Sequence, residues 1–277
     1  MIQDKITQLW VKLTGRRIDA FEDSWLTGPI GNESKIDDEY LTDLVKDGNI
    51  SIHRNVKNSG LIDDLSALGL SPEELSCIHP KVIDLYQNTS EYHFEIWSEW
   101  KSVFKPFGSL LGHVFSKRLQ QLNIPTSALA TAKGLHSEII KLKSNDRVVC
   151  TVWYRKIKSS NDVIYSGIYT TSFVPVFQKK LLKVVFPLPN GNASVIMTTK
   201  ICKGGALLLS SDGKKFGDNG FYFYLTDRKG NHWAKFVKAL HEWIKVYVDE
   251  DGILRTDHSF RFYGINFLNL HYKMTKK

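Results

Sequence analysis

Cysteine is scarce in this sequence. Its 277 residues include three cysteines, Cys77, Cys150 and Cys202, and they lie far apart. An odd number of widely separated cysteines argues against a disulfide framework, and no pair has the short spacing of a metal-binding motif. We therefore predict a protein of a reducing compartment without a cysteine-based metal site.

Long apolar runs are also absent. No run approaches the roughly 20 residues that a helix needs to span a bilayer. The chain begins Met-Ile-Gln-Asp-Lys, which mixes charged with apolar side chains, whereas a signal peptide needs an uninterrupted apolar core. These absences predict a cytoplasmic location, with peripheral attachment to a membrane surface as the alternative.

Basic residues are plentiful, but long basic runs are missing. The net charge is +8 and the pI is near 9.2, which favours anionic partners such as phospholipid headgroups or acidic small molecules. The lysines are dispersed, and no basic run exceeds a pair. Because nucleic-acid binding needs a concentrated basic face, we do not expect nucleic acid as a partner.

Sequence motifs of several enzyme classes are missing as well. No Gly-x-Ser-x-Gly nucleophile elbow occurs. The glycine-rich segments 203–205 and 213–220 match neither a P-loop nor a dinucleotide fingerprint, because a predicted strand follows where those motifs need a helix. We interpret them as a mobile loop over a barrel opening, and we expect no cofactor.

The N-terminal part, residues 1–134, shows helical patterns. One apolar stripe recurs at helical spacing: Ile2, Ile6, Leu9, Trp10 and Leu13. We favour a helix packed on the domain; the alternative is that residues 1–17 bind an anionic membrane surface. Further helices are predicted at 37–46, at 61–68, after the Ser71 capping box, after His79-Pro80, at 91–105 and at 107–122.

Residues 92–118 are rich in aromatic side chains. Trp97, Trp100 and Phe104 follow one another at three- and four-residue steps, which aligns them on one face of a helix. We favour a core stripe that covers one end of a sheet. Because lysines and an arginine flank the segment, contact with an anionic membrane is the alternative.

From residue 135 onward the apolar period changes to two, as in strands. Strands are predicted at 136–143, 148–157, 163–174, 181–186, 193–201, 206–210, 221–226, 232–240, 241–248, 253–262 and 265–274. Short turns join them, including a type I′ turn at Asn190-Gly191. These connections leave no room for crossover helices, so the strands pair antiparallel.

The predicted fold class is α+β, with a helical region (1–134) packed on an antiparallel β-meander (135–277). Such a meander curls to hide its edges, so we expect a barrel or a strongly curled sheet. Its strand count and meander resemble the lipocalin-like class of ligand-binding barrels. None of that class's sequence motifs occurs here, so no residue role is transferred from it.

The hairpin at 241–262 is the best-specified piece of the chain. Its turn suits a three-residue loop, 250–252, closed by Gly252 in the left-handed conformation. This register predicts one mostly apolar face, with Val248 opposite Leu254, Val246 opposite Thr256, Ile244 opposite His258, and Glu242 opposite Phe260. The other face then pairs Tyr247 with Arg255, Lys245 with Asp257, and His241 with Arg261.

A carboxylate and an imidazole on an apolar face mark the candidate site. The predicted ligand-binding residues are Glu242, Ile244, Val246, His258 and Phe260 facing inward, with Arg255 and Arg261 as outer-face alternatives for an anion. We predict noncovalent binding of a hydrophobic or amphipathic small molecule, lipid-like or anionic, in a barrel cavity.

Two further hypotheses stay open, and one is not favoured. The chain could be an enzyme with Glu242 and His258 as acid and base, or a peripheral membrane protein. A zinc site is not favoured, because strand order does not show that the candidate histidines converge. Those histidines are His232, His241, His258 and His271.

Overall fold

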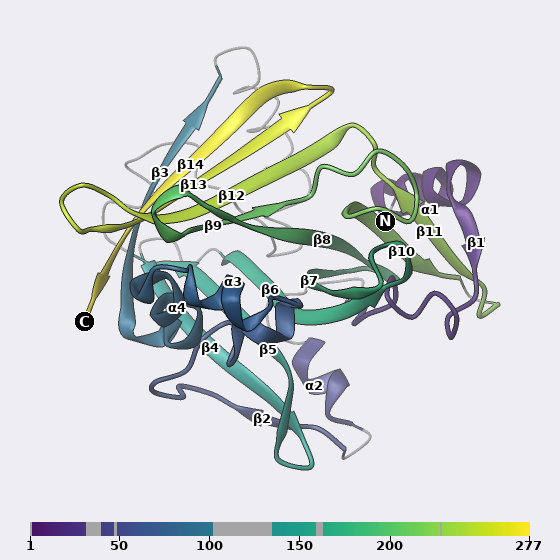
Figure 1. Cartoon of the computed structure of the whole chain (residues 1–277). Helices are drawn as coiled ribbons and strands as arrows, with labels where there is room; N and C mark the ends of the chain where they lie inside the picture. The colour runs from purple at the N-terminus through teal and green to yellow at the C-terminus, as the bar shows by residue number, and fades with distance from the viewer. Residues whose placement is uncertain (1, 32–39, 47–48, 102–134, 159–162, 228) are drawn as a thin grey trace.

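A computed structural model describes residues 2–31, 40–46, 49–101, 135–158, 163–227 and 229–277 (Figure 1). Its helices are α1 (Ile2–Thr14), α2 (Tyr40–Leu44), α3 (Pro72–Ser76) and α4 (Pro80–Gln87). Its strands are β1 (Arg16–Ile18), β2 (Ser51–His53), β3 (Tyr92–Trp100), β4 (Leu135–Ser144), β5 (Arg147–Ile157), β6 (Val163–Val174), β7 (Lys179–Leu188), β8 (Gly191–Cys202), β9 (Ala206–Ser210), β10 (Gly220–Thr226), β11 (His232–Phe236), β12 (Leu240–Val248), β13 (Leu254–Phe262) and β14 (Ile265–Lys276). The chain is therefore mostly strand with few helices, which agrees with the predicted α+β class.

The described strands form one antiparallel sheet that branches at β8. The main path runs β2-β4-β5-β6-β7-β8-β9-β12-β13-β14-β3. One edge of β8 pairs with β7. Along the other edge of β8, residues 191–196 pair with β10 and residues 198–202 pair with β9. One arm therefore continues through β9 to β3, while the other continues through β10 and β11 to β1 (Figure 1).

The sheet curls strongly on itself but its strand path stays open. Phe94 of β3, at one end of the path, packs against Trp153 of β5, near the other end, with ring centroids 5.2 Å apart. Arg155 of β5 likewise lies over the ring of Tyr272 in β14. Within the described strands, β2 and β3 do not pair with each other. The expected strongly curled sheet is thus present, whereas the described strands do not close into a barrel.

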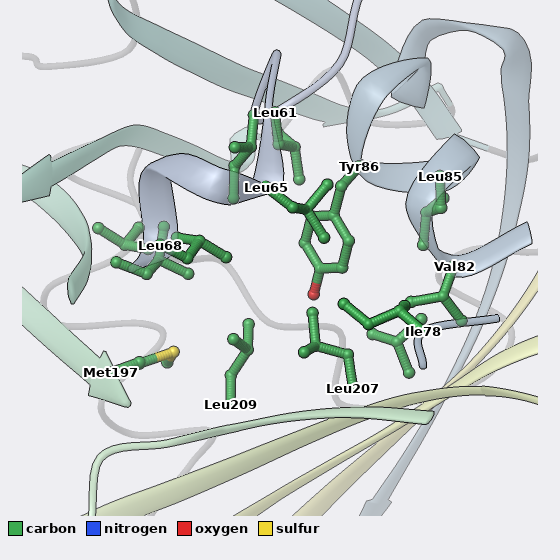
Figure 2. Close-up of a cluster of buried hydrophobic side chains, with 14 of the residues drawn as sticks. Leu61, Leu65, Leu68, Ile78, Val82, Leu85, Tyr86, Met197, Leu207 and Leu209 are labelled. Atoms are coloured by element: carbon green, nitrogen blue, oxygen red, sulfur yellow. The ribbon is translucent and has the colours of Figure 1, made fainter. Parts of the chain in front are cut away.

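Residues 61–87 fill one end of the concave face. Figure 2 shows Leu61, Leu65 and Tyr86 from this segment directed toward Leu207 and Leu209 of β9. Ser71 begins α3 with the predicted capping box, in which Ser71 and Glu74 exchange side-chain and backbone hydrogen bonds. The apolar side chains of this segment therefore form a core with the sheet rather than a separate domain core.

A buried lysine ties this segment to the sheet. Lys141 Nζ of β4 donates to the carbonyl oxygen of Gly60 and to Asp63 Oδ1, both at 2.6 Å, and to Thr151 Oγ1 at 2.9 Å. Burial lowers the pKa of Lys141, and the neighbouring Asp63 carboxylate opposes that effect. The charge is thus compensated inside the fold, as a buried ammonium group requires.

The outer face of the sheet is covered in two places. Tyr40 and Leu41 of α2 belong to a buried cluster with Ile140, Val152 and other residues of β4 to β7. Trp25 and Leu26 belong to another cluster that covers β7, β8, β10 and β11. The middle strands are consequently buried on both faces, which explains their long apolar runs.

The strand predictions from residue 135 onward agree with the structure, with one turn displaced. β4 to β14 lie within a few residues of the predicted ranges. The turn between β7 and β8 contains Pro189 and Asn190, and Leu188 pairs with Gly191. The predicted Asn190-Gly191 turn is therefore wrong by one residue, because Pro189 supplies the first turn position and Asn190 takes the positive φ of 61°.

The helix predicted at 91–105 is wrong. Residues 92–100 form strand β3, paired with β14 along its whole length. Tyr92, Phe94 and Ile96 alternate with polar or exposed residues, and aromatic and β-branched side chains favour a pleated surface. Trp97 is exposed, whereas Trp100 borders the interior cavity, so they do not share a face. Phe104 and the helix predicted at 107–122 lie outside the described residues.

Within its described residues, the N-terminal part is less helical than predicted. The helix predicted at 2–13 is confirmed as α1. Of the helix predicted at 37–46, the structure describes residues 40–46, which contain α2. The helix predicted at 61–68 is a single 3₁₀ turn, Leu65–Leu68. Since β1, β2 and β3 also come from this part, residues 1–134 contribute strands to the same sheet as well as helices.

Candidate functional site

The concave face of the sheet encloses a cavity of about 640 Å³. Its walls come from β3, β5 to β10 and β12 to β14, and most of the lining side chains are aliphatic or aromatic. From the segment 61–87, Leu61, Leu85 and Tyr86 line the cavity. From α1, Thr7 and Val11 line it. The cavity therefore lies between two helical covers and is walled by both arms of the sheet.

The hairpin formed by β12 and β13 contributes one wall, in the predicted register. Each predicted pair is present, from Val248 opposite Leu254 to His241 opposite Arg261. Gly252 has φ 72° and donates its N–H to the carbonyl oxygen of Asp249 at 3.0 Å, so it closes the expected turn. All five residues predicted to face inward line the cavity: Glu242, Ile244, Val246, His258 and Phe260.

Glu242 and His258 form a hydrogen-bonded pair on this wall. Their Oε2 and Nε2 atoms are 2.7 Å apart, and Glu242 is 4% exposed. The His258 ring packs on Phe260, with centroids 4.1 Å apart. A buried carboxylate needs such a partner, because an uncompensated charge is costly in an apolar interior. The pair is thus a polar feature inside an otherwise apolar cavity.

Arg255 and Arg261 lie on the outer face of the hairpin, away from the cavity lining. Arg255 Nε donates to Asp249 Oδ2, and this bond lowers the pKa of Asp249. The Arg261 guanidinium lies 4.8 Å from the ring centroid of Trp243. Both arginines therefore have partners of their own outside the cavity.

Arg155 of β5 is a cationic residue of the cavity lining, and sequence reasoning missed it. It is 2% exposed, and its guanidinium carbon lies 4.7 Å, 5.3 Å and 5.5 Å from the ring centroids of Trp153, Phe94 and Tyr272. The sequence did carry a signal for it, because β5 is apolar on both faces and an arginine within such a strand is expected to be buried. Buried charges are rare unless they are paired, so a buried arginine points to a special role.

Several tyrosines also border the cavity. Tyr165 Oη donates to Tyr169 Oη at 2.9 Å within β6. Burial raises the pKa values of Tyr165, Tyr169 and Tyr272, and for Tyr169 and Tyr272 the nearby Arg155 charge opposes that rise. These phenols are therefore neutral near pH 7, so each hydroxyl keeps a proton that it can donate.

The candidate histidines do not form a common site. No group of three or more potential ligands to a metal ion occurs within the described ranges. Each histidine has its own hydrogen-bond partner: Tyr224 for His232, the Lys238 carbonyl for His241, Glu242 for His258 and Asp257 for His271. The partners differ because the four side chains lie at separate places on the strands.

Both glycine-rich segments take part in hydrogen bonds with backbone groups. Gly205, between β8 and β9, accepts a hydrogen bond from the backbone N–H of His79 at 2.9 Å. In the segment 213–220, Asp218 Oδ2 accepts from the backbone N–H groups of Lys214 and Lys215. Both segments thus form hydrogen bonds, and a mobile loop over an opening stays a prediction.

Comparison with known proteins finds a relative whose own name calls it uncharacterized. No family model and no solved structure matches the chain significantly. The chain is similar to a protein of Bacillus subtilis (strain 168) named uncharacterized membrane protein YndJ, with 27% identity over 258 residues. The match covers 89% of this chain and 42% of the relative, so the chain spans less than half of that protein's length.

The relative's name corrects our expectation about location. A cytoplasmic protein was predicted, and that prediction conflicts with a relative named as a membrane protein. Neither the relative nor the open strand path supports the lipocalin-like and lipid-binding descriptions, and both are withdrawn. Among the described helices, none combines the length and the apolar character needed to cross a membrane.

Proposed function

We propose that the cavity binds a hydrophobic or amphipathic small molecule noncovalently. The observation that carries this proposal is the volume of about 640 Å³ together with its aliphatic and aromatic lining. Small-molecule sites commonly enclose about 300 to 1,000 Å³ and combine apolar walls with a few polar groups. Here the polar groups include the Glu242–His258 pair and Arg155.

The expected driving force is the burial of apolar ligand surface. A ligand that buries about 300 Å² of apolar surface gains ~7 kcal/mol from transfer out of water. Association costs part of this gain, because the ligand loses translational and rotational freedom. A molecule with a substantial apolar body is therefore favoured over a small polar metabolite.

The experiment combines native mass spectrometry of the purified chain with a fluorescence titration. Native spectra, followed by denaturing extraction, identify any molecule retained through purification. The titration uses N-phenyl-1-naphthylamine, a neutral apolar dye whose emission rises in apolar surroundings. We expect saturable binding of one dye per chain.

Matched variants locate the dye. Ala193→Trp places an indole at a cavity-lining position of β8, whereas Val149→Trp adds the same group at an exposed position of β5. We expect Ala193→Trp to weaken dye binding at least tenfold, or about 1.4 kcal/mol, and Val149→Trp to leave it unchanged. A folded protein without a retained molecule and without saturable dye binding contradicts the proposal.

We propose peripheral attachment to a membrane surface as a second function, supported by the exposed face of α1. Ile6, Leu9 and Leu13 are 61%, 56% and 74% exposed, although Val11 of the same helix is buried. Arg16 and Arg17, both exposed, follow the helix after Gly15. Apolar side chains beside basic ones suit the headgroup layer of an anionic membrane. The name of the Bacillus subtilis relative is consistent with this proposal.

Vesicle sedimentation tests the attachment. Ile6, Leu9 and Leu13 are replaced together by serine, and Phe173→Ser with Val176→Ser removes exposed apolar side chains elsewhere. We expect vesicles containing phosphatidylglycerol to bind the wild-type and control chains but not the α1 variant. Equal sedimentation of all three chains contradicts the attachment without affecting the cavity proposal.

A further inference from the structure

Arg155 is a charged group buried inside the cavity wall. It projects from β5 into the side of the cavity where β5, β3 and β14 meet across the curled sheet. The rings of Trp153, Phe94 and Tyr272 surround its guanidinium. Aromatic faces stabilise a cation electrostatically, but they accept none of its N–H hydrogen bonds in the way an oxygen does.

Two nitrogens of Arg155 lack hydrogen-bond partners within the described part of the chain. Nε and Nη2 are both buried and unpartnered. The described residues supply no carboxylate within 4.0 Å of the guanidinium. The carboxylate that lines the cavity, Glu242, is hydrogen-bonded to His258. Buried polar groups are rarely left without partners, so this cation is short of an anion.

The two free nitrogens have a geometry that selects a chemical class. Nε and Nη2 lie on the same edge of the guanidinium plane and direct two N–H bonds in parallel. This edge matches two oxygens of a carboxylate, sulfonate or phosphate group, which can bind both N–H groups at once. An uncharged carbonyl compound offers a single oxygen and fits the edge less well.

Neighbouring hydroxyl groups reinforce the preference for an anion. Tyr169 and Tyr272 both lie close enough to Arg155 for its charge to lower the pKa of their phenols, and a side-chain hydrogen bond from Arg155 lowers the pKa of Tyr272 further. Burial outweighs that effect and keeps both phenols protonated. A cation among neutral O–H groups in an apolar wall attracts a negative charge strongly, because few water dipoles screen it.

We propose that the cavity's ligand carries one oxyanionic group that pairs with Arg155 while its apolar body occupies the rest of the cavity. This inference rests on the proposed function and adds to it the charge of the ligand and the residue that recognises that charge. Because aromatic rings shield Nε and Nη2 from water, the anion reaches them after a small displacement of one of those side chains. Phe94, which is only half-buried, is the side chain we expect to move.

Two dyes with the same aromatic skeleton test the inference. One is N-phenyl-1-naphthylamine, which is neutral, and the other is 8-anilino-1-naphthalenesulfonate, which adds a sulfonate. We expect the wild-type chain to bind the sulfonate at least tenfold more tightly than the neutral dye, with each dye displacing the other. Arg155→Met keeps an apolar stem and removes the charge. The variant should therefore lose the preference for the sulfonate dye and still bind the neutral dye.

Arg261→Met is the matched control. Arg261 also lies over an aromatic ring, but on the outer face of β13, so its loss should leave the ratio of the two affinities unchanged. Arg155→Lys keeps the charge without the paired N–H edge and should give an intermediate ratio. This second variant, together with the wild-type ratio, tests the inference if Arg155→Met does not fold.

The outcomes separate the two proposals. If both dyes bind and their affinity ratio is the same in the wild type and in the Arg155 variants, the inference is overturned and the proposed function stands. A wild-type chain that binds the two dyes equally also overturns the inference. If neither dye binds the folded wild-type chain, the proposed function fails and the inference fails with it.

Discussion

Replacing Lys183 by methionine should stabilise the protein, and the gain should depend on pH. Lys183 lies in the middle of β7, 3% exposed, on the face opposite the cavity. Its ammonium group donates to the carbonyl oxygen of Thr27, and no carboxylate of the described residues pairs with it. Burial lowers its pKa from 10.5 to about 7, because an apolar environment disfavours the charged form.

The size and sign of the effect follow from proton linkage. A pKa difference of this size corresponds to ~5 kcal/mol at 1.36 kcal/mol per unit. Between pH 7 and 10.5 the unfolded chain binds more protons at this residue than the folded chain, so the wild type gains stability as pH rises. The penalty is therefore present in full below pH 7 and disappears toward pH 10.5.

Urea unfolding of the wild type and of Lys183→Met, measured from pH 6 to pH 10, tests this reasoning. We expect the variant to be more stable by ~3 to 4 kcal/mol at pH 6, because loss of the Thr27 hydrogen bond offsets ~1 kcal/mol of the gain. The difference should shrink by pH 10. Lys180→Met, at an exposed position of the same strand, should show neither effect. A stability difference that does not change with pH would refute the assignment.

Two further predictions concern backbone geometry and capping. Gly191→Ala should lower the unfolding free energy by ~2 kcal/mol or more, because a Cβ atom there would lie 2.0 Å from the carbonyl oxygen of Tyr224. Thermal unfolding measures this loss. An unchanged melting temperature would contradict the tight approach of β8 and β10. Ser71→Ala should cost ~1 kcal/mol by removing the N-cap of α3; urea unfolding should show that loss, whereas equal stability would mean that the cap is not formed in solution.

The sequence was most informative where short-range chemistry decides the structure. The pairing of β12 with β13 could be predicted because Gly252 fixes the turn and alternation fixes the face. That register also placed Glu242 near His258, and the structure shows the two side chains hydrogen-bonded. Local turn geometry was thus sufficient to predict one wall of the cavity.

Long-range contacts set the limit of prediction. Trp97 and Trp100 are three residues apart, a spacing that fits a helix face, and only pairing with β14 shows that they lie on a strand. Arg155 was missed for a similar reason. Its importance depends on the curl that brings β5 against β3 and β14, and no local pattern encodes that approach.

The pairing of early strands with late ones has a consequence for folding during synthesis. β3 finds its partner only when β14 has been made, and β1 must wait for β11. Contacts between distant parts of a chain form slowly, since a long loop must close before they contribute. The meander from β4 to β8 can assemble earlier, from neighbouring strands. The cavity walls are therefore completed late, and the apolar lining stays open to chaperones or to a ligand until β14 has been synthesised.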